Sequence, residues 1–314
     1  MADRAVEPLT TRVSEAFRHE HVPMLAVVSG GWFLSLGVRL VYPVLLPHLR
    51  TAYSLDLTTA GLLLTVLWLA YALGQVPAGI LADRIGEGRV LTLSCFLAAG
   101  MLLVVVLADS AVALFTGTAA LALGLTLYGV ARFVILADLF PENVGTATGI
   151  TLAAGDAGNA ILPPIAGVLA VTVAWQAGFG VLVPAFALAG VACWIYLPAA
   201  TSQGTSAVDA LSVSTARDIL ASLYRPVIVR GTAALLVGNA VWQAFTGFYP
   251  TYLVQVKGLS PTAAGAIFGG FFAMGILVKP LAGRAYDRAG IRRSLALIGG
   301  VMAASLATLP YVTG

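Results

Sequence analysis

The sequence predicts an all-α polytopic membrane protein, with an N-terminal bundle of six helices followed by three helices of a second bundle. Two observations support this fold class. First, 59% of the 314 residues are hydrophobic and only 10% are charged, whereas about a quarter of the residues in a soluble domain are charged. Second, the chain contains nine apolar stretches, each close to the roughly 20 residues that a helix needs to cross a lipid bilayer.

The apolar stretches divide the chain into four regions. Residues 1–21 form a charged cytoplasmic segment, and residues 22–197 form the six-helix bundle. Residues 198–225 are rich in Ser, Thr and Ala and are expected to be a cytoplasmic linker, and residues 226–314 hold the last three helices. The expected helices cover residues 22–47, 57–82, 90–108, 111–136, 145–173, 177–197, 226–254, 262–282 and 294–312.

The basic residues predict the orientation of these helices. Cytoplasmic segments of membrane proteins carry an excess of Lys and Arg. With the N-terminus inside, the outer segments hold only Arg50 and Lys257. The inner segments hold Arg4, Arg12, Arg18, Arg84, Arg89, Arg217, Arg225, Arg230, Arg284, Arg288, Arg292 and Arg293. We therefore expect the cytoplasmic membrane, an inner N-terminus and an outer C-terminus for this chain, and the same bias explains the basic pI without nucleic-acid binding.

Several other function classes lack sequence support. Cys95 and Cys193 lie within apolar runs, where a free thiol behaves as a small hydrophobe. The histidines lie outside the apolar spans, so neither a metal site nor a cofactor is expected. The chain has no G-x-x-x-x-G-K-[ST] motif of an ATP-driven pump. The Asp156 and Asp287 dipeptides resemble intramembrane aspartyl protease motifs only in reversed order, so no enzyme activity is expected.

A charged turn occurs twice in the chain. Its pattern is G-x-x-x-D-R-x-G-x-x-R, and the second copy lies 204 residues after the first. Each copy follows an apolar helix and precedes another, so one structural unit has been used twice. The first copy comprises Gly79, Asp83, Arg84, Gly86 and Arg89. The second comprises Gly283, Asp287, Arg288, Gly290 and Arg293.

Six helices, an inner linker and a repeated Asp-Arg turn after the second helix of each half resemble the major facilitator superfamily of secondary transporters. The resemblance implies two six-helix halves around a midplane site for a small-molecule substrate, and transport by alternating access. It also leads us to expect a monomer. By the family plan, helices 10 to 12 are missing, so we expect either a fragment or a protein that lacks part of its second half.

The resemblance implies a gating role for the two turns. In the family, the aspartate of the turn faces the other half and caps a helix there, which assigns this role to Asp83 and Asp287. A pairing of Arg84 or Arg89 with Asp138, after the fourth helix, is a further hypothesis. The alternative is that these charges only fix the topology as solvated groups.

The sequence departs from the family pattern beside both of these elements. Glu87 and Gly88 stand in the first turn where basic residues are usual. Val144 stands in the loop after the fourth helix where arginine is common. The inner charge cluster is weakened accordingly.

Arg39 is the first candidate for binding an anion. A charge within the membrane usually faces the interior of the bundle or a watery cavity, and a guanidinium fork suits a carboxylate or a phosphate. Its partner in the repeat, 204 residues later, is Gln243. Tyr42, Asn239 and Trp242 are the other expected substrate-binding residues. The alternative is that Arg39 pairs with another residue or extends toward the surface.

Asp156 is the candidate for proton coupling. It lies about 18 Å from the inner end of its helix, near the midplane, where a desolvated carboxyl group can take up and release a proton. Pairing with Arg132 is the alternative and would keep it charged. Lys279 is expected to extend to the inner surface. Pro163 and Pro164 predict a bend in the helix that carries Asp156.

Together these patterns predict a secondary active transporter of a small solute, with an organic anion as one candidate and protons as a candidate coupling ion. The rival interpretation is a sensor or partner subunit that uses the same scaffold without transport. Fold alone does not choose the substrate.

Overall fold

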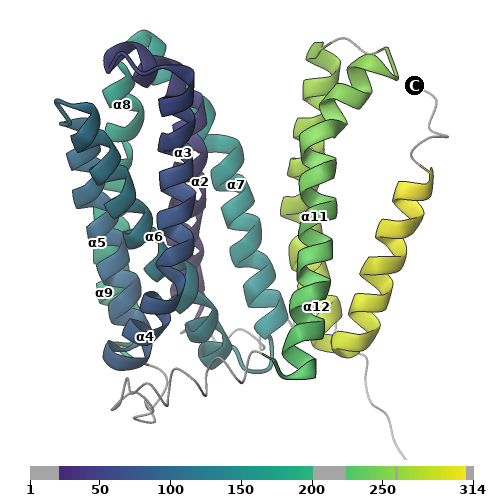
Figure 1. Cartoon of the computed structure of the whole chain (residues 1–314). Helices are drawn as coiled ribbons and strands as arrows, with labels where there is room; N and C mark the ends of the chain where they lie inside the picture. The colour runs from purple at the N-terminus through teal and green to yellow at the C-terminus, as the bar shows by residue number, and fades with distance from the viewer. Residues whose placement is uncertain (1–20, 201–223, 259–260, 309–314) are drawn as a thin grey trace, which may run out of the picture. The chain divides into compact units, whose positions relative to one another are not determined.

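The structure is a computed structural model that describes residues 21–200, 224–258 and 261–308. These residues are almost entirely helical (Figure 1). The chain forms two compact units. The first comprises Met1–Gly204 with Ala273–Ala296, and the second comprises Thr205–Phe272 with Leu297–Gly314. The expected N-terminal segment and most of the expected linker lie outside the described residues.

The first unit is built mainly from helices that precede the linker. Helix α2 lies along α7, α5 packs between α6 and α9, and α3 packs on α6 (Figure 1). These helices are α2 (Val22–Ala52), α3 (Leu57–Leu73), α4 (Gln75–Ile85), α5 (Glu87–Val106), α6 (Ala111–Leu139), α7 (Val144–Thr172), α8 (Trp175–Gly180) and α9 (Leu182–Tyr196).

Among the described residues, the helices long and apolar enough to cross a membrane lie between Val22 and Tyr196. There are 5 of them, or up to 6 when the bent pair α3 and α4 counts as one span. They correspond to the six helices expected there. The three later spans correspond to α11 (Pro226–Gln255) and the two arms of α12 (Pro261–Thr308), and they stay predictions as membrane spans.

The helix expected over residues 57–82 is broken at Gly74, where α3 and α4 meet at 42°. A Cβ atom on Gly74 would lie 2.8 Å from Oγ1 of Thr126 on α6. The same hydroxyl donates a hydrogen bond to the carbonyl of Tyr71, at 3.0 Å. A side chain that inserts beside a glycine and takes up a helix carbonyl is a known cause of kinks. Helix α7 continues through Pro163 and Pro164, and the bend expected at these prolines stays a prediction.

The two charged turns have the same backbone. Helix α4 ends at Ile85 and α5 begins at Glu87, with Gly86 alone between them at φ 92° and ψ 149°. Gly290 interrupts α12 at φ 74° and ψ 167°. Only glycine adopts this region readily, which explains the glycine in the repeated motif. A turn of one residue replaces the longer loop expected after each helix.

Candidate functional site

Arg39 is buried in the first unit, with 4% of its surface exposed. Its Cζ atom lies 4.3 Å from the ring centroid of Tyr71, 5.3 Å from that of Trp32 and 5.6 Å from that of Trp68. Its Nε donates to the carbonyl oxygen of Ser35 at 2.9 Å, while Nη2 has no partner within the described residues. Aromatic faces attract a cation, so the three rings stabilise this guanidinium within the bundle.

Arg132 on α6 approaches the same indole ring. Its Cζ atom lies 3.3 Å from the centroid of Trp32 and 4.0 Å from that of Phe133, and its side chain is also almost fully buried. Nη1 donates to the carbonyl of Gly129, whereas Nε lacks a partner in the part of the chain that the structure describes. Trp32 therefore contacts two buried guanidinium groups, those of Arg39 and Arg132.

Tyr42, the other expected substrate residue of the first unit, has different neighbours. Tyr42 is fully buried, its hydroxyl shares a hydrogen bond with Thr118 at 3.1 Å, and its ring packs on Phe179 at 4.7 Å. These contacts place Tyr42 in the packed core of the bundle, and its role in substrate binding stays a prediction. Asn239 is exposed on α11 in the second unit, and the side chains of Trp242 and Gln243 lie outside the described residues.

Asp156 forms an ion pair with Lys279, through Nζ of the lysine and Oδ2 of the carboxylate. The alternative pairing of Asp156 with Arg132 was wrong, because Asp156 pairs with Lys279 and the Arg132 guanidinium lies over Trp32. The expected course of Lys279 toward the inner surface was also wrong, because its ammonium group reaches Asp156.

The direction of the helices explains this pairing. Gly283 lies beside Gly145, and a Cβ atom on Gly149 would lie 2.5 Å from the carbonyl oxygen of Lys279. The order of these contacts shows that α7 and this part of α12 run antiparallel. Side chains tilt toward the N-terminus of their own helix, so those of Asp156 and Lys279 lean toward each other. The glycines allow the two backbones to approach closely.

Asp287 caps the beginning of α7 at the other end of this contact. One carboxylate oxygen accepts from the backbone N–H of Gly145 at 2.7 Å, and the other from the N–H and hydroxyl of Thr146 at 2.8 and 2.7 Å. The first N–H groups of a helix lack partners within it, and its positive end favours a carboxylate. This is the capping contact that the resemblance implies for Asp287.

The first turn is arranged differently. Asp83, Arg84 and Arg89 are exposed at the junction of α4 and α5, and Asp138 is exposed near the end of α6. The neighbouring Glu87 is buried in the first turn of α5, where the positive end of the helix favours a carboxylate. The gating role of this turn and its pairing with Asp138 stay predictions.

Sequence reasoning missed Trp32 and Tyr71 as neighbours of Arg39. Trp32 was detectable, because it precedes Arg39 by two helical turns and thus lies on the same face of α2. Tyr71 on α3 carried no such local signal. Among the described residues, no group of three or more His, Cys, Asp or Glu side chains could hold a metal ion.

Comparison with known proteins places this architecture in a family. The sequence pattern described as Major Facilitator Superfamily matches residues 27–314. The chain is a member of the Major Facilitator Superfamily. This membership makes it a multi-pass membrane protein of a transporter family, whose setting is the lipid bilayer and whose ligands are small molecules.

Three curated relatives in this superfamily are named as transporters. The chain is 29% identical to the 2-nitroimidazole transporter of Escherichia coli (strain K12), over 91% of this chain and 73% of the relative. It is 24% identical to the hexuronate transporter of Bacillus subtilis (strain 168), over 78% and 59%. It is 26% identical to the nitrite extrusion protein of the same organism, over 84% and 66%. The chain thus spans between about three fifths and three quarters of these superfamily relatives.

A solved structure has a similar fold. A mutant peptide transporter POT, crystallised with sulfate, superposes with a TM-score of 0.54 and 17% identity. The match covers 76% of this chain and 50% of that protein. At this identity the likeness concerns the fold alone.

Proposed function

We propose that this superfamily member is a secondary active transporter that moves a small anion across the cytoplasmic membrane by alternating access. The observation that supports it best is the contact between α7 and the Ala273–Ala296 part of α12. Its two polar ends, the Asp287 cap and the Lys279–Asp156 ion pair, hold the helices together through groups that water or a proton can satisfy instead. Such a contact can open and close repeatedly.

The chemistry shared by the relatives supports a proposal for the substrate class. A nitroimidazole, a hexuronate and nitrite differ in size, but each carries a planar group of one central atom with two oxygens. A guanidinium fork matches two such oxygens with parallel N–H donors. The buried Arg39 supports the same class in this chain, and we propose that the solute is nitrite or a small anion that carries a carboxylate or a nitro group.

Proton coupling is proposed at Asp156. In the ion pair its carboxylate neutralises Lys279 within the bundle. Uptake of a proton by the carboxylate removes the negative charge, so the attraction between α7 and α12 weakens. A charged residue within a membrane span is a default candidate for a proton pathway. In this scheme, the contact between α7 and α12 is weaker in the protein that has taken up a proton than in the proton-free protein.

The test is solute flux in proteoliposomes that contain the purified protein. Nitrite, radiolabelled glucuronate and 2-nitroimidazole are offered with and without an imposed proton gradient. We expect saturable uptake of at least one solute, at a rate above that of protein-free liposomes. In the Asp156→Asn variant we expect a lower uptake rate that no longer depends on the imposed proton gradient. Binding of these solutes without any flux would instead support a sensor on the same scaffold.

A further inference from the structure

Three N–H donors remain without partners around the indole of Trp32, within the described residues. They are Nη2 of Arg39, Nε of Arg132 and Nε1 of Trp32 itself. Each of the three side chains is only 4% exposed. Buried donors are almost always hydrogen-bonded in folded proteins, because removal from water without a replacement acceptor is unfavourable. Three orphan donors around one ring therefore indicate a position for an acceptor that enters from outside.

The charge at this position also calls for an anion. Arginine keeps its positive charge in proteins and offers only donors. Stacking on aromatic rings compensates part of the desolvation of Arg39 and Arg132. The contacts of Arg39 and Arg132 within the described residues are with aromatic rings and backbone carbonyl oxygens. None of these contacts supplies a full negative charge to balance the two positive charges on one indole.

We infer that Arg39, Trp32 and Arg132 form one binding site for a small planar oxyanion, a carboxylate or an ion such as nitrite. This inference rests on the proposed function and names the residues that hold the substrate. The guanidinium groups donate to the anion's oxygens, and the indole N–H adds a third donor. The burial of all three residues limits the size of the group that enters.

The site is connected to the ion pair through α7. The indole nitrogen of Trp32 lies against Gly155, where a side chain would collide with it. Gly155 directly precedes Asp156, which pairs with Lys279. An anion that draws the Trp32 N–H into a hydrogen bond therefore acts on the segment of α7 that carries the ion pair.

The proposed site predicts an unusual effect of substitution on the stability of the protein. A side chain that serves packing destabilises the protein when it is replaced. Arg132 instead holds a second buried positive charge near that of Arg39, and burial of an uncompensated charge is unfavourable. Arg132→Gln should therefore leave the thermal midpoint of the anion-free protein unchanged or raise it, while anion binding is lost.

The experiment measures the thermal midpoint of the purified, detergent-solubilised protein during titration with sodium nitrite or sodium acetate, with sodium chloride at equal ionic strength as the reference. A ligand that binds the folded state raises the midpoint in proportion to ln(1 + [L]/Kd). We expect a rise with a planar oxyanion beyond that with chloride. Arg132→Gln should raise the apparent Kd about tenfold or more, since a hydrogen bond to a charged group is lost.

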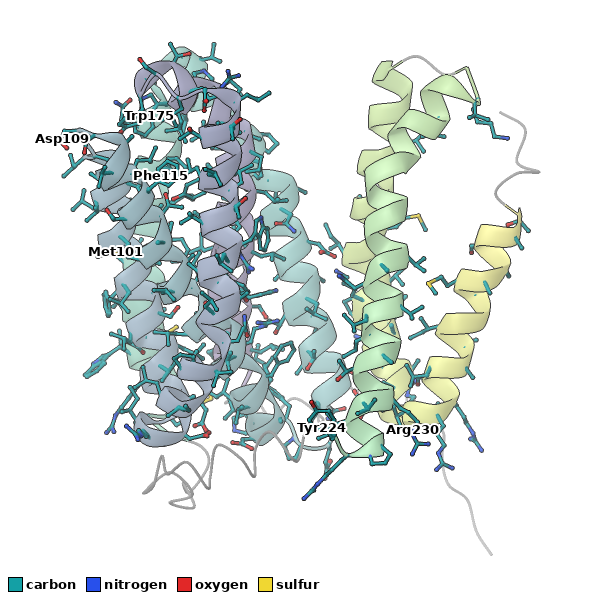
Figure 2. All side chains as sticks on the ribbon, viewed as in Figure 1. Met101, Asp109, Phe115, Trp175, Tyr224 and Arg230 are labelled. Carbon is teal, nitrogen blue, oxygen red and sulfur yellow. The ribbon has the colours of Figure 1, made fainter. Side chains whose placement is uncertain are left out.

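Two further variants keep the test decisive. Trp32→Phe preserves an aromatic face but removes the indole donor, and should raise the apparent Kd about threefold or more. Arg230→Gln is the matched control, because Arg230 is exposed near the start of α11 (Figure 2). Its loss should leave the apparent Kd unchanged. An oxyanion-dependent shift that is absent from the wild type, or unchanged in both site variants, would overturn the site. If both site variants keep the shift and the wild-type protein still shows solute flux, the proposed function is retained and only this site is wrong.

Discussion

Lys279 and Asp156 form an ion pair between α12 and α7, although 123 residues of sequence separate them. The side chain of Lys279 is 34% exposed and that of Asp156 is 12% exposed. At the other end of the same contact Asp287 binds the first residues of α7. The two polar contacts bracket a crossing at which glycine lets the backbones meet.

Exchange of the charges tests whether this ion pair matters as a pair. Lys279→Asp or Asp156→Lys alone places two like charges together and should abolish most of the flux. Each should also lower stability, by less than the roughly 3–5 kcal/mol of a fully buried pair, because Lys279 is partly exposed. The double variant restores opposite charges and should regain flux and thermal midpoint. A double variant no better than either single variant would show that the pairing is incidental.

The two turn aspartates should respond differently to the same substitution. Asp287→Asn replaces one of two accepting oxygens with a donor, and should destabilise the protein by about 0.5–2 kcal/mol, the range for a lost N-cap. Asp83 is exposed, so Asp83→Asn should leave the thermal midpoint almost unchanged and still reduce flux. Midpoints and proteoliposome uptake are measured together. An unaltered rate for Asp83→Asn would remove its gating role.

The glycine turns predict a graded effect on stability. Alanine at Gly86 or Gly290 must adopt a strained backbone, which is unfavourable by about 1–3 kcal/mol. Gly86→Ala should be the worse of the two, because its Cβ would lie 2.6 Å from that of Ala200 while Gly290 has open space. Gly100→Ala, within α5 and also in open space, is the control and should stabilise by about 0.5–1 kcal/mol. Equal thermal midpoints for the Gly86 and Gly290 variants would contradict the close packing at Gly86.

Acid should loosen the start of α3. The carboxylate of Asp56 accepts from the N–H of Thr59 at 2.7 Å, and hydrogen bonds from Thr59 lower the pKa of Asp56 below its ordinary value of 3.8. A lowered folded-state pKa means that the stabilisation is complete above that ordinary value and is lost as the pH falls through the folded-state pKa. Asp56→Asn keeps a capping oxygen without a charge, so its thermal midpoint should fall less steeply below pH 4. Identical acid profiles would assign the acid sensitivity to other groups.

The sequence was most informative where the physical signal is local. Apolar runs predicted the helices of the first unit, and the repeat at 204 residues predicted that Gly86 and Gly290 occupy equivalent turns. Side chains tilt toward the N-terminus of their own helix. This tilt also favours a Lys279 side chain that points back along its helix, toward the middle of the apolar span.

The remaining features depend on contacts between distant segments. The break at Gly74 requires Thr126 of α6, and the position of Arg39 requires rings from both α2 and α3. No local sequence pattern predicts such contacts. The alternative pairing of Arg132 with Asp156 was wrong for the same reason, because Asp156 pairs with Lys279 of a distant helix and the Arg132 guanidinium lies over the indole of Trp32.

The most direct test of transport is uptake of a planar oxyanion by proteoliposomes, with Arg39→Ala and the exposed Arg230→Gln as a matched pair of charge removals. We predict saturable uptake by the wild type and by Arg230→Gln, and a loss of uptake in a folded Arg39→Ala protein. Uptake in Arg39→Ala equal to that of the wild type, or wild-type uptake no greater than that of protein-free liposomes, would contradict it.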